Sequence, residues 1–157
     1  MFHQASTKQQ GLTSTPNVSY FLLNNFSVGL STPLMFVKFS ESRTMTYSIG
    51  PQVRYYVPVK SWAIFSEVNY TTGWYNFEGE SFTSFGVVED VKIDGRINSI
   101  MLGFGTTYFI TKNVGLEGII FYQRVESDYD DNFFNSDQTL SSINFKFGVQ
   151  VYINNVE

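Results

Sequence analysis

The feature that most constrains the fold is a strict alternation of large apolar and small or polar residues over 44–57. Apolar or aromatic side chains occupy the odd positions from Met45 to Val57, and mostly polar or small ones the even positions from Thr44 to Tyr56. Side chains of a β-strand point alternately to its two faces, so the segment predicts a strand with one apolar and one polar face. A closed sheet of such strands can turn its apolar face to lipid and its polar face to a narrow interior.

The composition narrows the class of protein. Charged residues make up 15% of the 157 residues, against about 25% in an average soluble domain, and aromatic residues reach 18%. The formal net charge is −4, and the ten Lys and Arg residues are scattered along the chain. A basic patch for nucleic acid is therefore not expected.

Similar alternation recurs along most of the chain and predicts an all-β antiparallel sheet. The expected strands are 13–23, 26–38, 44–57, 62–75, 95–110, 114–126 and 139–153. Short connections at 24–25, 58–61 and 111–113 alternate with longer ones at 40–43, 76–91 and 127–138, the asymmetry of outer-membrane barrels. Proline cannot donate a hydrogen bond to a sheet, so a local bulge is expected at Pro16 and at Pro51.

A repeated hairpin pattern is the basis for comparing this chain with a known family. Residues 15–21 and 50–56 share a Pro-x-Val-x-Tyr-aromatic sequence just before a short turn, and 105–109 is a weaker echo. Hairpins such as 50–59 followed by 61–74 resemble those of the small outer-membrane β-barrels of Gram-negative bacteria, the porin-family and OmpA-like barrels common in Bacteroidetes. The resemblance implies an up-and-down transmembrane barrel of the eight-stranded type in the outer membrane. The barrel domain would span 13–153, between an N-terminal segment 1–12, disordered or the remnant of an outer loop, and a C-terminal tail 154–157.

The number of expected strands is odd, whereas bacterial single-chain barrels have even numbers. The first expected strand runs toward a short turn, so the strand that should precede it would lie upstream of residue 1. The first ten residues also lack the basic and apolar regions of a secretory signal. One hypothesis is therefore a chain without its signal peptide and first strand. The alternative is that residues 8–14 or 82–88 supply the eighth strand.

Charged and amide residues on the polar face form the first candidate site. An interior of about eight strands is just wide enough for side chains to fill, so buried charges there must pair. Arg54 and Glu117 lie at one expected depth, and Glu67 and Lys146 somewhat deeper. The sequence predicts one structural network filling the lumen, built from Gln52, Arg54, Glu67, Asn69, Glu117, Lys146 and Gln150.

Aromatic residues on the apolar face form the second candidate site. Side chains with one apolar and one polar end favour the two interfaces of a membrane. The expected interface aromatics are Tyr20, Tyr55, Trp62 and Tyr108 near the short turns, and Tyr70 and Trp74 near the longer loops.

The sequence contains no residue pattern that indicates catalysis, metal binding or cofactor binding. The only histidine is His3, outside the expected barrel, and there is no cysteine, so neither a Ser-His pair near the membrane rim nor a thiolate site can be assembled. The acidic stretch 127–132 lacks the Gly and Glu positions of an EF-hand calcium loop and is interpreted as a solvated loop. No enzyme activity, metal or cofactor is expected.

The sequence thus predicts an integral outer-membrane barrel, a monomer in contact with outer-membrane lipid, with a structural or surface-interaction role. Its outer loops would carry any binding partner, which the residues do not identify. Two alternatives remain open. One is a soluble lipocalin-like barrel that encloses a hydrophobic ligand, and the other is a small passive outer-membrane channel.

Overall fold

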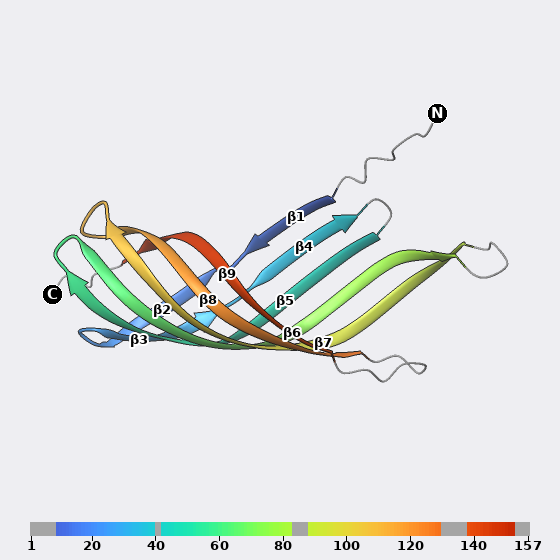
Figure 1. Ribbon diagram of the computed structural model, residues 1–157, viewed down its shortest axis with the longest axis horizontal. Helices are drawn as coiled ribbons and strands as arrows, with labels where there is room; N and C mark the ends of the chain where they lie inside the picture. The colour runs from blue at the N-terminus through green and yellow to red at the C-terminus, as the bar shows by residue number, and fades with distance from the viewer. Residues whose placement is uncertain (1–8, 40–41, 83–87, 130–137, 153–157) are drawn as a thin grey trace, which may run out of the picture.

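The chain folds into one antiparallel β-sheet that curls into a half-barrel (Figure 1). The structure, a computed structural model, describes residues 9–39, 42–82, 88–129 and 138–152. The strands in this part of the chain are β1 (Gln9–Ser14), β2 (Asn17–Leu23), β3 (Phe26–Ser31), β4 (Leu34–Phe39), β5 (Ser42–Val59), β6 (Trp62–Phe82), β7 (Val88–Phe109), β8 (Val114–Tyr129) and β9 (Gln138–Val151). The predicted all-β, up-and-down class is confirmed. No helix in the described ranges has the length and apolar character to cross a membrane.

The nine strands occupy seven successive positions in the sheet, here called paths, because two of the positions are each filled by two short strands in line. β5 pairs with β4 along its first half and with β3 along its second half, so β3 and β4 are two pieces of one path. β1 and β2 likewise lie along β4 and β3. From β5 to β9 each strand pairs antiparallel with the next. These paths correspond to the seven strands that the alternation predicts.

Two prolines interrupt the first two paths where the sequence predicts continuous strands. β1 ends before Thr15 and Pro16, and β3 ends before Thr32 and Pro33. The breaks lie side by side, since Thr32 donates both its backbone N–H and its hydroxyl to the carbonyl of Pro16, at 2.9 and 3.1 Å. The expected bulge at Pro16 is thus a full interruption.

The other expected bulge, at Pro51, is absent. β5 and β6 keep one register on either side of Pro51, from Ile49↔Thr72 to Gln52↔Asn69. The register shift in this region lies instead between Phe21 and Leu23, where β2 approaches its hairpin turn.

The described parts of the segments expected as long loops are strand. β6 runs to Phe82 and β7 starts at Val88, so most of 76–91 is a paired extension of the hairpin. β8 continues to Tyr129, and the segments 40–41, 83–87 and 130–137 lie outside the described residues. At the N-terminal end, β1 begins at Gln9, four residues before the expected boundary of the barrel at residue 13.

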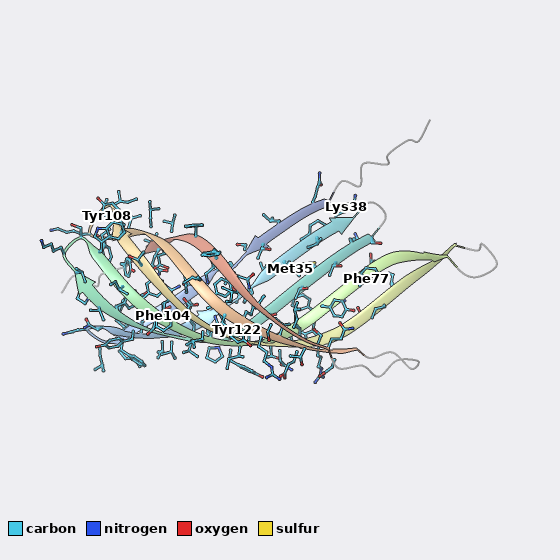
Figure 2. All side chains as sticks on the ribbon, in the orientation of Figure 1. Met35, Lys38, Phe77, Phe104, Tyr108 and Tyr122 are labelled. Carbon is cyan, nitrogen blue, oxygen red and sulfur yellow. The ribbon has the colours of Figure 1, made fainter. Side chains whose placement is uncertain are left out.

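The two faces of the sheet differ sharply in burial. Along β5 and β6 exposed and buried residues alternate, with the apolar set exposed on the outer side and the polar set buried on the inner side. Phe104, Tyr108 and Tyr122 belong to the outer set, and Figure 2 shows these side chains against the ribbon. The largest fully buried side chains include Arg54, Gln52 and Glu67, beside Phe65. The interior of this sheet therefore combines buried polar and charged side chains with a small apolar cluster around Phe65 and Ile119, whereas an ordinary hydrophobic core contains few polar groups.

Close backbone approach explains the glycine at position 50. A Cβ added to Gly50 would collide with the backbone of Tyr70 and Thr71 on β6. We expect Gly50→Ala to lower the free energy of unfolding by about 1–3 kcal/mol, because the two strands must separate to admit the methyl group. Urea unfolding followed by tryptophan fluorescence measures the change.

The matched control for that substitution is Gly148→Ala on β9. A Cβ added to Gly148 would meet no atom within 4 Å, so its effect is expected to stay within about 0.5 kcal/mol. Equal unfolding midpoints for the two variants would contradict the close approach of β5 and β6.

Candidate functional site: the polar interior

Arg54 stands at the centre of the buried polar interior. It lies opposite Glu67 in the register of β5 and β6, so both side chains leave the sheet on the inner face. The guanidinium Nε donates to Oε2 of Glu67 at 2.8 Å, and Nη1 donates to Oε2 of Glu117 at 2.9 Å. The side chain of Arg54 is 2% exposed and that of Glu67 is fully buried. One cation thus bridges two carboxylates from strands that are not neighbours in the sheet.

Hydroxyl groups complete the shell around this cluster. Nη1 of Arg54 also donates to the hydroxyl oxygen of Tyr56 at 3.1 Å. The hydroxyl of Thr107 donates to Oε1 of Glu117 at 3.1 Å, and that of Tyr152 donates to the same atom at 3.5 Å. A buried charge is tolerated when its hydrogen-bonding capacity is satisfied, and these partners meet that condition for Glu117.

Lys146 supplies the second positive charge. Its Nζ lies 3.8 Å from Oε1 of Glu67, which is an ion-pair distance but too long for a hydrogen bond. That carboxylate oxygen makes no hydrogen bond in the described part of the chain. The ammonium also lies over the ring of Phe121, 5.8 Å from its centroid. Among the described residues, this cluster therefore holds two cations and two carboxylates, whose formal charges cancel.

Aromatic rings close the interior at the end where the short turns lie. Phe21 of β2 packs against Tyr56 with ring centroids 5.4 Å apart, and Tyr56 packs against Phe65 at 5.5 Å. Tyr152 follows β9 directly, and its ring centroid lies 5.4 Å from that of Phe109 and 6.2 Å from that of Phe21. The ring of Phe65 also stacks on the guanidinium of Arg54 at 4.8 Å. We call these five aromatic residues the aromatic plug.

The structure brings together four of the seven predicted interior residues, namely Arg54, Glu67, Glu117 and Lys146. Gln52 and Asn69 are buried on the same face, 1% and 5% exposed. Both amide atoms of Gln52 are buried without a hydrogen-bond partner among the described residues. Gln150 is half-buried opposite Gly115.

Tyr56, Thr107 and Tyr152 take part in the network but were missing from the sequence prediction. The signal for them was present in the alternation. Tyr56 has the same parity as Gln52 and Arg54 on β5, and Tyr152 has the same parity as Lys146 near β9. Alternation over 44–57 therefore already places Tyr56 on the polar face, and the same rule extended past β9 places Tyr152 there as well.

The predicted interface aromatics all lie on the outer face. Each of them is between 43% and 68% exposed: Tyr20, Tyr55, Trp62, Tyr70, Trp74 and Tyr108. Two pairs cross neighbouring strands, with Trp62 and Tyr108 at 4.8 Å between ring centroids and Tyr47 stacked on Trp74 at 5.6 Å. Such cross-strand aromatic pairs stabilise the sheet and fix its register.

A second charged cluster lies on the outer face, beyond Trp74 toward the far end of β6. Glu78 there pairs with Arg43 and with Lys92, the latter at 3.3 Å. Hydrogen bonds from these two cations lower the pKa of the Glu78 carboxyl below its ordinary value. Both cations are well exposed, so this cluster contributes little to stability and serves below as a control.

Metal-ligating side chains do not gather anywhere in the described residues. The acidic stretch considered for calcium is described only as far as Tyr129, and its remaining residues lie outside the described part.

The fold and site define a class, a curled antiparallel sheet with a charged, hydrogen-bonded interior and an apolar outer face. No family model matches the chain, and comparison with curated proteins and with solved structures found no significant match.

Proposed function

We propose that this chain is an integral outer-membrane β-barrel protein of a Gram-negative bacterium, with a structural or surface-interaction role. Its outer face contacts lipid, and its interior is filled by the ion-pair network and the aromatic plug. Extracellular loops at the end opposite the short turns are the place where a partner would bind.

The observation that carries the proposal is the inverted distribution of polarity. Fully buried Arg54 and Glu67 lie on the inner face, while large apolar residues cover the outer face of most strands. A water-soluble protein would leave that apolar surface as a large exposed patch, which is rare in soluble monomers. A lipid bilayer removes the conflict, because it solvates apolar side chains and forces polar groups inward. A soluble lipid carrier needs the reverse arrangement.

The spacing of the outer aromatics also supports a bilayer. Trp62 and Trp74 on β6 both face outward, and they lie twelve positions apart along the strand. At about 3.3 Å per residue and a strand tilt of about 40°, they stand roughly 30 Å apart along a barrel axis. This distance suits the two aromatic girdles that flank the apolar band of an outer-membrane barrel.

The filled interior favours a structural role over conduction. Arg54 joins β5, β6 and β8 across the lumen, and the aromatic plug occupies the short-turn end. An interior that side chains fill is the expected state of a barrel of about eight strands, and larger barrels leave aqueous channels.

Vesicle flotation tests the proposal. The chain is refolded with phosphatidylcholine vesicles. The vesicles are washed with urea at a non-denaturing concentration and with alkaline carbonate, and are then centrifuged in a density gradient. We expect it to float with the lipid after both washes, because its apolar face is embedded in the bilayer. Recovery as a folded, monodisperse protein at the bottom of the gradient would contradict membrane integration.

A further inference from the structure

We propose that the open side of the half-barrel, between β9 and the β1–β2 path, is a binding site for one additional β-strand from another polypeptide segment. The incoming strand runs antiparallel to both edges, with apolar side chains outward and small or polar side chains inward.

The first argument is the unpaired backbone on both sides of the opening. Among the described residues, β9 pairs only with β8, β1 only with β4 and β2 only with β3. Within the described part of the chain, no strand pairs with the far edge of β1, of β2 or of β9 from Thr139 to Val151. Such an edge is a template for pairing with a further strand.

The second argument is the direction of the two edges. The β1–β2 path and β9 are the first and seventh members of an antiparallel series, so they run the same way. A single strand running the other way can pair antiparallel with both of them. A second copy of this chain in the same membrane orientation would instead offer edges that run parallel, so it does not fit the opening in this way.

The third argument is the width of the interior, which sets the number of added strands at one. Arg54 on β5 reaches Glu117 on β8, and Phe21 on β2 reaches Tyr152 beyond β9, so side chains already meet across the lumen. An interior that side chains can fill corresponds to about eight strands. Seven paths and one added strand give that number.

The chemistry of the edges specifies the partner. The outward residues of β9, such as Phe145 and Phe147, are 72% and 85% exposed, and Val18 and Tyr20 on β2 are 70% and 68% exposed. An apolar outward face on the added strand continues this surface. The interior charges already balance, so the inward face should be uncharged or small.

A peptide that copies residues 62–74 of β6 with the change Glu67→Gln is a suitable probe. The β6 strand pairs antiparallel on both sides in the protein itself, and the change leaves the inward face of the peptide uncharged. The chain contains no cysteine, so single cysteines can be placed at will. Val18→Cys marks one edge and Phe147→Cys marks the other. The peptide carries its own cysteine in place of Val68, at its midpoint, and the folded full-length chain is held in detergent micelles.

We expect disulfide formation between the peptide and each edge cysteine, and none when the peptide cysteine is moved to the Trp74 position at its end. Leu102→Cys is the matched control, since Leu102 is equally apolar and outward but lies on β7, which is paired on both sides. A peptide of the same composition without alternation should not cross-link. Cross-linking at Leu102→Cys as strong as at the two edges would overturn the proposal, as would a disulfide between Val18→Cys of one chain and Phe147→Cys of another.

The unmodified chain gives an independent readout. Binding of the alternating peptide to the folded state should raise the thermal unfolding midpoint as peptide concentration increases, whereas the rearranged peptide leaves it unchanged. No shift with either peptide would refute the strand site. Both measurements use micelles, so a negative result here leaves vesicle flotation as a separate test of membrane integration.

Discussion

Replacing Glu67 with alanine is expected to lower the free energy of unfolding by about 3–5 kcal/mol, because it leaves Arg54 buried with part of its charge uncompensated. The 2.8 Å hydrogen bond from Nε of Arg54 is lost, and Lys146 loses its carboxylate partner as well. Glu117 still pairs with Arg54, so the interior stays occupied. Urea unfolding in detergent micelles or vesicles measures the loss of stability.

The control for this substitution is Glu78→Ala, which removes another carboxylate with two cationic partners. The partners of Glu78 are exposed, so the change in the free energy of unfolding should be far smaller than for Glu67→Ala. A Glu67→Ala variant as stable as Glu78→Ala would show that the buried network does not hold the sheet together.

Planar-bilayer recording separates stability from conduction in the same variants. The aromatic plug is untouched by Glu67→Ala, so neither that variant nor the unmodified chain should carry a steady single-channel current. Large, steady currents in the unmodified protein would contradict the filled interior and favour a passive channel.

If the outer face contacts lipid as proposed, replacing Val68 with arginine is expected to cost about 2–4 kcal/mol in a bilayer, because it sets a charge near the midplane. Val68 is 46% exposed on the outer face and lies midway between Trp62 and Trp74 on β6. Folding into vesicles at increasing urea concentration measures the difference from the unmodified chain.

Ile110→Arg is the matched control at the membrane boundary. Ile110 is 55% exposed and lies just beyond the end of β7, at the level of the short turns. Charges near the interface cost about 0–1 kcal/mol. If Val68→Arg and Ile110→Arg fold equally well, the outer face of β6 does not contact the hydrocarbon core.

Much of the fold was predictable because one physical rule, the two-residue period of a strand, acts along most of the chain. Alternation places Arg54 and Glu67 on the same inner face, but it predicts Glu67 at a greater depth. The structure sets the two residues directly opposite each other, because the short turn at 58–61 fixes the register of the hairpin. The position of Glu117 and Lys146 on the same inner face follows from the same rule. Their meeting across the lumen depends on the curl of the whole sheet, which alternation does not specify.

The strand boundaries were predicted wrongly where the residues on the two faces no longer differ in polarity. Over 76–91 both faces of the hairpin carry polar residues, so the pattern resembled a loop although pairing continues past Trp74. The proline breaks depend on two segments, at Pro16 and Pro33, lying side by side, which is a tertiary fact. Alternation places Tyr56 on the polar face, but the predicted network includes only charged and amide residues, so both Tyr56 and Tyr152 are missing from it.

The central claim is that the apolar outer face contacts lipid, and quenching of tryptophan fluorescence by brominated lipids tests it most directly. The chain has two tryptophans, Trp62 and Trp74, both on that face, and the variants Trp62→Phe and Trp74→Phe report on them one at a time. After refolding into vesicles, we predict strong quenching of both by lipids brominated along the acyl chain, relative to ordinary lipids. A folded chain in which neither tryptophan is quenched would contradict the membrane assignment.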